Sequence, residues 1–241
     1  IKFILNDLNL SEDNALFIDD SEFEIGQVKN FFPNLDTLLV PKDIKNFEKL
    51  FNYVGNFETF SITKEDKKRT KLYQDEEKRK KEIIKFKNSE DYIKSLNINL
   101  MIKNNNKKNI KRLSQMTLKT NQFNTTTLRL NENKIEKYIN DNNYLVSQCS
   151  AEDKFGDYGI IGLAIIKINK SNKKAIVENT LFSCRALGRM IEEHFYQKII
   201  NDLKLKKIKI IEFPFTISNK NKPALNFFND HTFRKIKINK Q

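Results

Sequence analysis

The chain has 241 residues, of which 39% are hydrophobic, and this length is enough for one large domain or two small ones with a buried core. Its formal net charge is +13, but the lysines are interleaved with acidic residues and no basic segment carries the aromatic residues of a stacking platform, so the composition argues against nucleic acid as a partner. No apolar run approaches the roughly 18 residues that a membrane-spanning helix needs, and we expect no membrane partner.

Residues 1–60 alternate between short apolar runs and an amphipathic segment. Residues 15–18 and 38–40 are compact apolar runs, and residues 22–32 between them have helical spacing. This strand–helix–strand order predicts part of a parallel, Rossmann-like sheet. Because the chain begins inside an apparent helix over residues 1–11, we expect it to be the back part of a longer protein.

Residues 61–96 are densely charged and poor in apolar residues. Thr63, with an acidic residue at Asp66, is typical of a helix start, and the predicted helix runs to about Lys87. Such a helix is predicted to be a solvated connector between two domains. The alternative is a docking face for an acidic partner.

Residues 97–241 are predicted to form a second domain. Short turns such as residues 169–172 join consecutive strands, which favours antiparallel pairing. The predicted strands lie near residues 100–102, 144–149, 159–168, 175–182, 207–213 and 233–238. The predicted helices cover residues 107–118, 131–140, 187–203 and 223–228. We therefore predict an α/β fold whose sheet is mostly antiparallel.

Cysteine and histidine are sparse. Cys149 and Cys184 are far apart and form no Cys-x-x-Cys pair, which argues against a zinc site or a disulfide scaffold and is compatible with a cytoplasmic protein. His194 and His231 are the only histidines, and neither is a metal candidate, because no second ligand can be assigned to it.

The segment from Ser183 to Phe195 combines features of an anion site. A strand ends at Ser183, the chain turns through Gly188, and an amphipathic helix follows, so free backbone N–H groups point at one place. Arg185 and Arg189 flank the glycine and could bind a phosphate. Cys184 lies where a positive field would favour the thiolate, which makes it a candidate nucleophile. An ordinary glycine turn with surface arginines and an inert cysteine is the alternative.

Two further groups could bind ligands. Asp19 and Asp20 end a predicted parallel strand, where two carboxylates suit Mg²⁺, although an N-cap for the next helix explains them equally well. Asn121, Gln122 and Asn124, together with Asp157, could hold a polar substrate or a pantetheine arm. The same amides could instead stabilise their own loop.

Several motifs occur in an order that resembles the C-terminal part of FkbH-like proteins, in the IIIC branch of the haloacid dehalogenase (HAD) superfamily. The resemblance covers nearly the whole chain, and its motifs are specific only in combination. They are Phe-Ile-Asp-Asp-Ser-Glu-Phe-Glu at 17–24, Arg69-Thr70 with Tyr73, Thr-Asn-Gln-Phe-Asn at 120–124, Asp-Lys-Phe-Gly-Asp-Tyr-Gly at 153–159 and Ser-Cys-Arg-Ala-Leu-Gly-Arg at 183–189.

The resemblance implies a protein of two parts. Residues 1–60 would be the C-terminal half of a HAD-like domain, in which Asp19 and Asp20 help to hold Mg²⁺. Residues 61–96 would be the charged helical connector, and residues 97–241 would form a GNAT-like (N-acetyltransferase-like) domain.

The resemblance also implies an activity. Several members load a glyceryl group from a bisphosphoglycerate onto an acyl carrier protein and remove the phosphate. The implied partners are thus an acyl carrier protein and a phosphorylated three-carbon acyl donor. Arg185, Gly188 and Arg189 would lie near the phosphate of a phosphopantetheine arm or of CoA, and Cys184 would carry the acyl group as a thioester.

The chain departs from these patterns at three places. The Asp-x-Asp nucleophile motif of HAD phosphatases is absent, so we expect no phosphatase activity from this chain alone. Met190 replaces the last small residue of the pattern Arg-x-x-Gly-x-Gly/Ala, and Phe228 stands where acetyltransferases have a tyrosine acid. These changes favour a carrier- or acyl-binding role. An N-acetyltransferase that uses acetyl-CoA and a non-catalytic docking module for a carrier protein are the alternatives.

Overall fold

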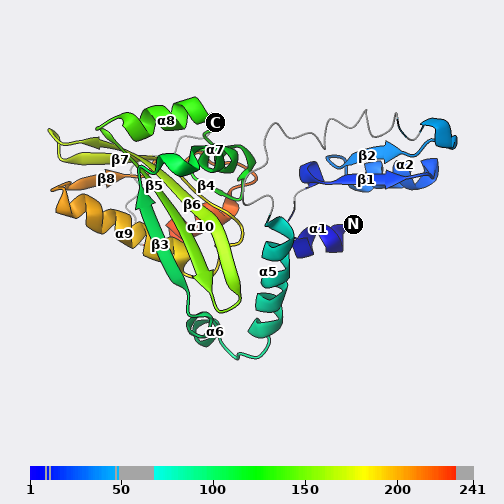
Figure 1. The fold of residues 1–241 in the computed structure, drawn as a ribbon, viewed down its shortest axis with the longest axis horizontal. Helices are drawn as coiled ribbons and strands as arrows, with labels where there is room; N and C mark the ends of the chain where they lie inside the picture. Colours follow the sequence, from blue (N-terminus) through cyan, green and yellow to red (C-terminus); the bar gives the residue numbers. More distant parts are fainter. Residues whose placement is uncertain (9, 11, 47, 49–67, 232–241) are drawn as a thin grey trace. The chain divides into compact units, whose positions relative to one another are not determined.

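The computed structural model describes residues 1–8, 10, 12–46, 48 and 68–231 (Figure 1). The chain divides into two compact units, Ile1–Ile62 and Thr63–Gln241. The predicted helix start at Thr63 and Asp66 and the predicted strand near residues 233–238 lie outside the described residues. Within the described part of the chain, no helix is long and apolar enough to cross a membrane.

The first unit contains a strand–helix–strand element with two parallel strands. Helix α2 begins where Ser21 caps it, because the Ser21 hydroxyl accepts a hydrogen bond from the Glu24 backbone N–H at 3.3 Å. Ile25 and Val28 are its buried residues. The elements of this unit are α1 (Lys2–Leu8), η1 (Glu12–Asn14), β1 (Leu16–Asp19), α2 (Glu22–Phe31), β2 (Asp36–Leu39) and η2 (Ile44–Asn46).

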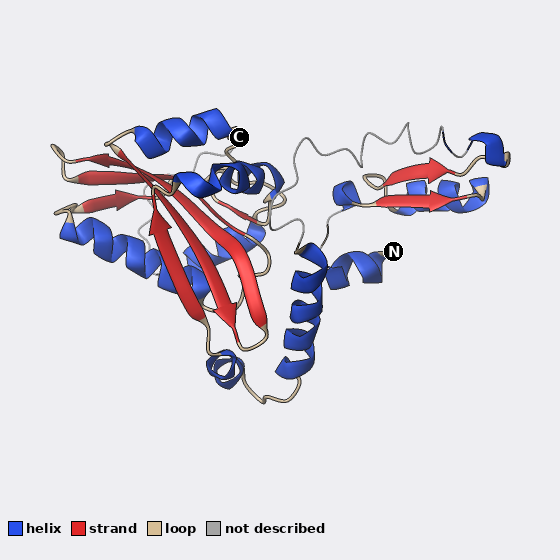
Figure 2. Ribbon diagram, in the orientation of Figure 1, coloured by secondary structure: helices blue, strands red, loops and turns tan. Residues whose placement is uncertain are grey.

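The second unit is built on a six-stranded sheet in the order β3-β5-β6-β7-β4, with β8 also paired to β7 (Figure 2). All neighbours are antiparallel except β7 and β8. The strands are β3 (Asn99–Asn104), β4 (Phe123–Asn124), β5 (Tyr144–Asp153), β6 (Gly156–Asn169), β7 (Lys174–Phe182) and β8 (Ile210–Glu212). The predicted α/β class and the mostly antiparallel sheet are confirmed.

Helices cover both faces of this sheet (Figure 1). Leu113 of α7 and Ile135 of α8 pack with Leu163 on one face, whereas Phe195 of α9 and Ala224 of α10 pack on the other. Strand β6 is therefore buried from both sides, which explains its nearly continuous apolar sequence. The helices are α5 (Arg69–Ile83), α6 (Ser89–Leu96), η4 (Lys107–Asn109), α7 (Ile110–Lys119), α8 (Glu132–Asn140), α9 (Ile191–Leu205) and α10 (Lys222–Asp230).

Helix α5 belongs to the second unit and has buried residues there, so the expectation of a solvated connector is wrong for this part of the segment. Leu72, Asp75 and Arg79 of α5 are buried. Two of these three residues are charged, and such residues give no apolar periodicity from which burial could be predicted.

Helix α9 begins four residues later than predicted, at Ile191 rather than Leu187. Gly188 has φ 75° and Met190 has φ 58°, both in the left-handed region that a right-handed helix excludes. The chain therefore makes a turn over residues 183–190, which we call the arginine turn.

One edge of β7 is shared by two short strands. Strand β8 pairs with residues 174–176 of β7, and β4 pairs with residues 181–182. The polar loop that contains β4 is thereby placed beside the end of β7, where the arginine turn begins.

Candidate active site

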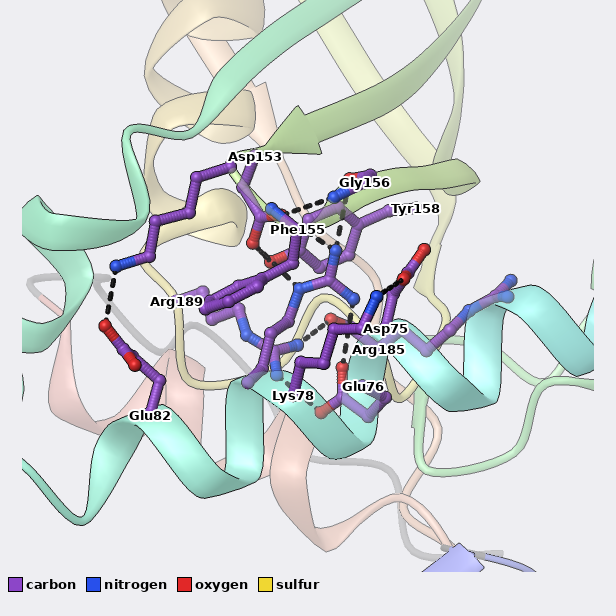
Figure 3. Close-up of polar contacts among 12 residues, drawn as sticks. Asp75, Glu76, Lys78, Glu82, Asp153, Phe155, Gly156, Tyr158, Arg185 and Arg189 are labelled. Atoms are coloured by element: carbon purple, nitrogen blue, oxygen red, sulfur yellow. Dashed lines mark hydrogen bonds and ion pairs between the residues drawn. The ribbon is translucent and has the colours of Figure 1, made fainter.

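Three arginines gather where α5 meets the arginine turn and the β5–β6 hairpin. Arg79 belongs to α5, and Arg185 and Arg189 belong to the turn. Figure 3 shows the two turn arginines grouped with Glu76 of α5 and with Asp153 at the hairpin. We call these five residues the arginine cluster.

Arg79 and Asp153 form a buried, two-pronged ion pair. The Arg79 Nε and Nη2 atoms donate to the two Asp153 carboxylate oxygens at 2.8 and 2.9 Å, and the two side chains are 1% and 0% exposed. The Tyr158 hydroxyl donates to the same carboxylate at 2.7 Å, and its ring centroid lies 3.8 Å from the Arg79 guanidinium carbon. Burial alone would raise the pKa of Asp153, but the hydrogen bonds from Arg79 and Tyr158 hold that pKa below its usual value.

Arg189 is also paired. Its Nη2 atom donates to Glu76 Oε1 at 2.5 Å, and its Nη1 atom donates to the Arg185 carbonyl. Burial would lower the pKa of Arg189, but the Glu76 carboxylate and Tyr158 outweigh it and leave that pKa raised. This predicted phosphate ligand therefore already has an anionic partner.

Arg185 differs from the other two arginines. Its side chain is partly buried, and burial lowers the pKa of its guanidinium. Its electrostatic neighbours include Cys184, Tyr73 and Glu76. Among the residues that the structure describes, its guanidinium forms no hydrogen bond or ion pair, so Arg185 is the arginine of this cluster that is available to an external anion.

The candidate nucleophile Cys184 lies directly before Arg185 and is partly exposed. Its carbonyl accepts a hydrogen bond from the Leu187 backbone N–H at 3.3 Å, which helps to form the arginine turn. Cys149 is fully buried in β5, and burial raises the pKa of its thiol far above the ordinary range. Of the two thiols, only Cys184 is placed to react with a ligand.

A buried carboxylate directly follows the arginine turn. Glu192, in the first turn of α9, is 5% exposed, and its Oε2 atom has no hydrogen-bond partner among the described residues. Burial raises the pKa of Glu192 to about 7. Glu192 is buried because the inward side of α9 is wide and includes Glu192 and Tyr196 beside Ile191 and Phe195.

A small cavity adjoins the turn. It has a volume of about 140 Å³ and is lined in part by Tyr92, Gly188 and Arg189. Since a water molecule occupies roughly 30 Å³ in the liquid, this space would take about four waters or a group of similar size. A larger hollow of about 470 Å³ lies at the start of α8, but the Arg129 guanidinium on its wall donates to the carbonyls of Thr117 and Thr120.

The predicted substrate-binding amides have structural partners. Asn124 is fully buried, donates to the Thr120 carbonyl at 3.1 Å and accepts from the Thr127 backbone N–H at 3.0 Å. Asn121 accepts a hydrogen bond from Arg129, and Gln122 also has a partner. These contacts match the loop-stabilising alternative.

Asp157 lies apart from this loop. It is exposed, faces Lys68 at 3.5 Å and accepts the Gly159 backbone N–H at 2.7 Å. The loop that contains β4 lies beside the end of β7, where Phe182 is opposite Gly162 of β6. Asp157 is five residues before Gly162, so it lies about 17 Å along β6 from this point. The structure does not bring Asp157 together with the loop amides.

Asp19 ends β1 as predicted, and its Oδ1 atom accepts the Ser21 backbone N–H at 2.8 Å. Asp20 is exposed beside it. Within the described ranges, no cluster of three or more acidic, histidine or cysteine residues could hold a metal ion. The described residues therefore do not complete a Mg²⁺ site, and the N-cap of α2 is Ser21 rather than Asp19 or Asp20, so the predicted N-cap role of these two acids is wrong.

Phe228 and Met190 are the two residues at which the sequence departs from the acetyltransferase pattern. The Phe228 ring packs against Tyr196, with 5.6 Å between ring centroids, and offers no proton. Met190 is 45% exposed and precedes α9 in the left-handed conformation. The nearby Tyr196 is 3% exposed, and its hydroxyl faces Thr180 without completing a hydrogen bond.

No protein-family model matches the sequence, and no curated protein matches it either. Parts of the chain are similar to solved structures. The ribosomal-protein-S18-alanine N-acetyltransferase of Escherichia coli is 11% identical, with a TM-score of 0.44 over 58% of this chain and 80% of that chain. An aminoglycoside acetyltransferase from an uncultured soil metagenomic sample is 13% identical, with a TM-score of 0.42 over 58% and 93%. A transcriptional regulator of Bacillus halodurans C-125 is 13% identical, with a TM-score of 0.39 over 58% and 99%.

Sequence reasoning missed three of the site's buried charges. Arg79 and Asp153 are 74 positions apart in the chain, and no local pattern links them. Glu192 was recognisable as an acid at a helix start but not as a buried one. No local signal marks Arg79 as buried, because Leu72 is the one apolar residue among the three buried residues of α5.

Proposed function

We propose that this protein transfers an acyl group through Cys184, while Arg185 binds a phosphate of the acyl donor. The observation that supports the proposal is the state of Arg185, a partly buried cation without an ion pair among the described residues, next to a thiol. Burying an unpaired charge costs free energy, and a bound phosphate would supply the missing partner with charge-assisted hydrogen bonds.

The chemistry requires the donor carbonyl to lie beside the sulfur. For an acyl phosphate, the Cys184 sulfur forms a bond to the carbonyl carbon and the carbon–oxygen bond to phosphate breaks. The phosphate leaves with that electron pair and takes up the proton of the thiol. Arg185 would stabilise the negative charge that grows on the leaving oxygen.

In its narrower form, the proposal follows the FkbH-like resemblance. The donor would be a phosphorylated three-carbon acyl compound such as 1,3-bisphosphoglycerate, and the acceptor would be the pantetheine thiol of an acyl carrier protein. No step is assigned to Mg²⁺, because the described residues do not complete a site for it.

Acetyl-CoA is the second candidate donor. Gly188 has the left-handed backbone that lets a turn of the Arg-x-x-Gly type precede a helix, and this turn could accept the pyrophosphate of CoA. Against this candidate, Phe228 offers no proton to a leaving thiolate.

Intact-mass measurement after incubation with each donor tests the proposal. With 1,3-bisphosphoglycerate, we expect a gain of one 3-phosphoglyceryl group, because only the acyl phosphate leaves; this gain should disappear in Cys184→Ala and persist in Cys149→Ala, the matched control with a buried thiol. Transfer of the label to an added acyl carrier protein would support the narrower form. A gain that survives Cys184→Ala, or no gain with either donor, would overturn the thioester route.

A further inference from the structure

Exposed lysines gather at the end of the sheet where β6 turns into β7. Some of them are in this turn, and the others are at the end of α9 and in the segment that leads to β8. The backbone N–H groups of Lys209 and Ile210 donate to the Lys173 carbonyl at 2.7 and 3.2 Å, so these two parts of the chain lie side by side (Figure 1). The exposed lysines, which we call the lysine patch, are Lys170, Lys173, Lys204, Lys206, Lys207 and Lys209.

The charge of the lysine patch is not compensated within the part of the chain that the structure describes. Two acidic residues flank the patch in the sequence, but other lysines pair with them. Asp202 of α9 pairs with Lys198 at 2.6 Å. Glu212 of β8 pairs with Lys174 at 2.8 Å. No lysine of the patch forms an ion pair with a described residue, so the repulsion among these ammonium groups would be relieved by an anionic partner.

Two lysines of the patch have a backbone that favours other residue types. Lys173 has φ 51° and Lys207 has φ 62°, both in the left-handed region. Glycine and asparagine adopt this region more readily than a residue with a long side chain. Local backbone preference therefore does not explain the lysines at these two turns, and such local inconsistency is expected where a surface has a function.

A large apolar side chain lies within the patch. Leu205, the last residue of α9, is 83% exposed and stands between Lys204 and Lys206. Exposed apolar residues among lysines are typical of surfaces that bind a bilayer, where the apolar group enters the boundary of the acyl chains and the ammonium groups bind lipid phosphates. Residues 170–174 and 204–210 contain no arginine and no aromatic residue, the residue types that read base edges and stack on bases.

We propose that the lysine patch and Leu205 bind the surface of a membrane that contains anionic lipids. The expectation of no membrane partner was based on the lack of a spanning segment, and a surface contact does not need one. The nine residues of β7 separate the patch from the arginine turn by about 30 Å. A protein bound through the patch would therefore keep the arginine turn away from the lipid and open to its donor.

Co-sedimentation of the full chain with lipid vesicles tests the proposal. The vesicles are made of phosphatidylcholine, either alone or with about one third phosphatidylserine. We expect binding to the vesicles with phosphatidylserine, a loss of this binding as added salt screens the lysines, and no binding to phosphatidylcholine alone. Equal binding to both kinds of vesicle, or no binding to either, would overturn the proposal.

Variants test whether the patch itself makes the contact. Lys204→Gln with Lys206→Gln should weaken binding about twentyfold, because each lysine near an anionic surface strengthens it about fivefold. The matched control is Lys111→Gln with Lys119→Gln, which removes the same charge from exposed positions of α7 and should weaken binding less than about fivefold. Leu205→Ser leaves the charge unchanged and should weaken binding about tenfold.

The controls separate a lipid site from two simpler explanations. Equal losses in the two double variants would show that net charge alone drives the binding, and this would overturn the proposal. A duplex DNA that binds more tightly than the vesicles, and that loses affinity in Lys204→Gln with Lys206→Gln, would assign the patch to nucleic acid instead. The mass gain on Cys184 is a separate measurement, so the proposed function does not depend on any of these results.

Discussion

Replacing Arg79 by methionine tests whether the buried ion pair attaches α5 to the sheet. The methionine keeps an apolar stem of similar length but removes the guanidinium from Asp153, whose side chain is 0% exposed. Removing one partner of a buried pair costs about 3–5 kcal/mol of unfolding free energy. Asp153 would keep the hydrogen bonds from the Tyr158 hydroxyl and from two backbone N–H groups, so we expect a loss near the lower end, about 3 kcal/mol.

The loss should depend on pH. In the wild type the pKa of Asp153 lies below its usual value, so its contribution to stability is present above the unfolded pKa of about 3.9 and is lost as the pH falls through the folded pKa. Without Arg79, burial would dominate and raise that pKa. The destabilisation by Arg79→Met should therefore be largest at neutral pH and shrink as acid protonates Asp153.

Urea unfolding followed by far-UV circular dichroism measures the effect, since the chain has no tryptophan. Lys81→Met is the control on the same helix, where an exposed pair with Glu77 should contribute less than about 1 kcal/mol. The double variant Arg79→Met, Asp153→Asn should recover part of the loss, because no buried charge is left unpaired. Two results would refute the reasoning. One is a loss in Arg79→Met no larger than that in Lys81→Met, and the other is a double variant whose loss equals the sum of the losses in Arg79→Met and Asp153→Asn.

Two further predictions concern the core and the turn. Gly162→Ala should lower the unfolding free energy by about 1–3 kcal/mol, because the new Cβ would overlap Cys149 Sγ and lie 2.7 Å from Phe182 Cε1. An unchanged urea midpoint would contradict this. Adding Cys149→Ala should restore part of the loss. Glu192→Gln should stabilise the protein by up to about 3 kcal/mol at pH 8, because the wild-type carboxyl has its pKa raised from 4.5 to about 7 and its ionisation in the folded state costs free energy. Because the pKa is raised, the neutral carboxyl contributes its full stability below pH 4.5, and this contribution is lost as the pH rises towards 7. The unfolding free energies of the wild type and Glu192→Gln should therefore converge in acid. An equal difference at pH 5 and pH 8 would show that the charge of Glu192 is not the cause.

The apolar strands of the second unit were the most predictable elements. Residues 159–168 and 175–182 were identified because β6 and β7 are covered on both faces and need continuous apolar sequence. The short connection between them also predicted their antiparallel pairing correctly. These features depend on local composition and on loop length, both of which the sequence contains.

The sequence predicted that a turn lies before α9, but it did not predict the residue at which that helix begins. Gly188 marks a turn, and its left-handed backbone agrees with that role. Met190 also has a left-handed backbone, which costs a residue with a side chain about 1–2 kcal/mol and is not signalled by its residue type. This second left-handed residue delays the start of α9 until Ile191.

Burial of charge was the feature that no local pattern could predict. A charged helix such as α5 has the composition of a solvated surface, and the partner that buries Arg79 lies in a hairpin 74 residues further along the chain. Only the packing of α5 against the β5–β6 hairpin brings Arg79 to Asp153 at the end of β5, so composition alone assigned this segment to the solvent.

The two uncompensated charges of the arginine turn support a functional interpretation together more strongly than either does alone. Arg185 and Glu192 are seven residues apart and of opposite sign, yet neither has an ion-pair partner among the described residues, and they do not pair with each other. If stability alone governed this turn, pairing them or replacing them with apolar residues would lower the free energy of the folded state. Sequences that are locally inconsistent in this way are expected at functional sites. A phosphate bound at Arg185 would supply the partner that this cation does not have among the described residues, as the proposed function requires.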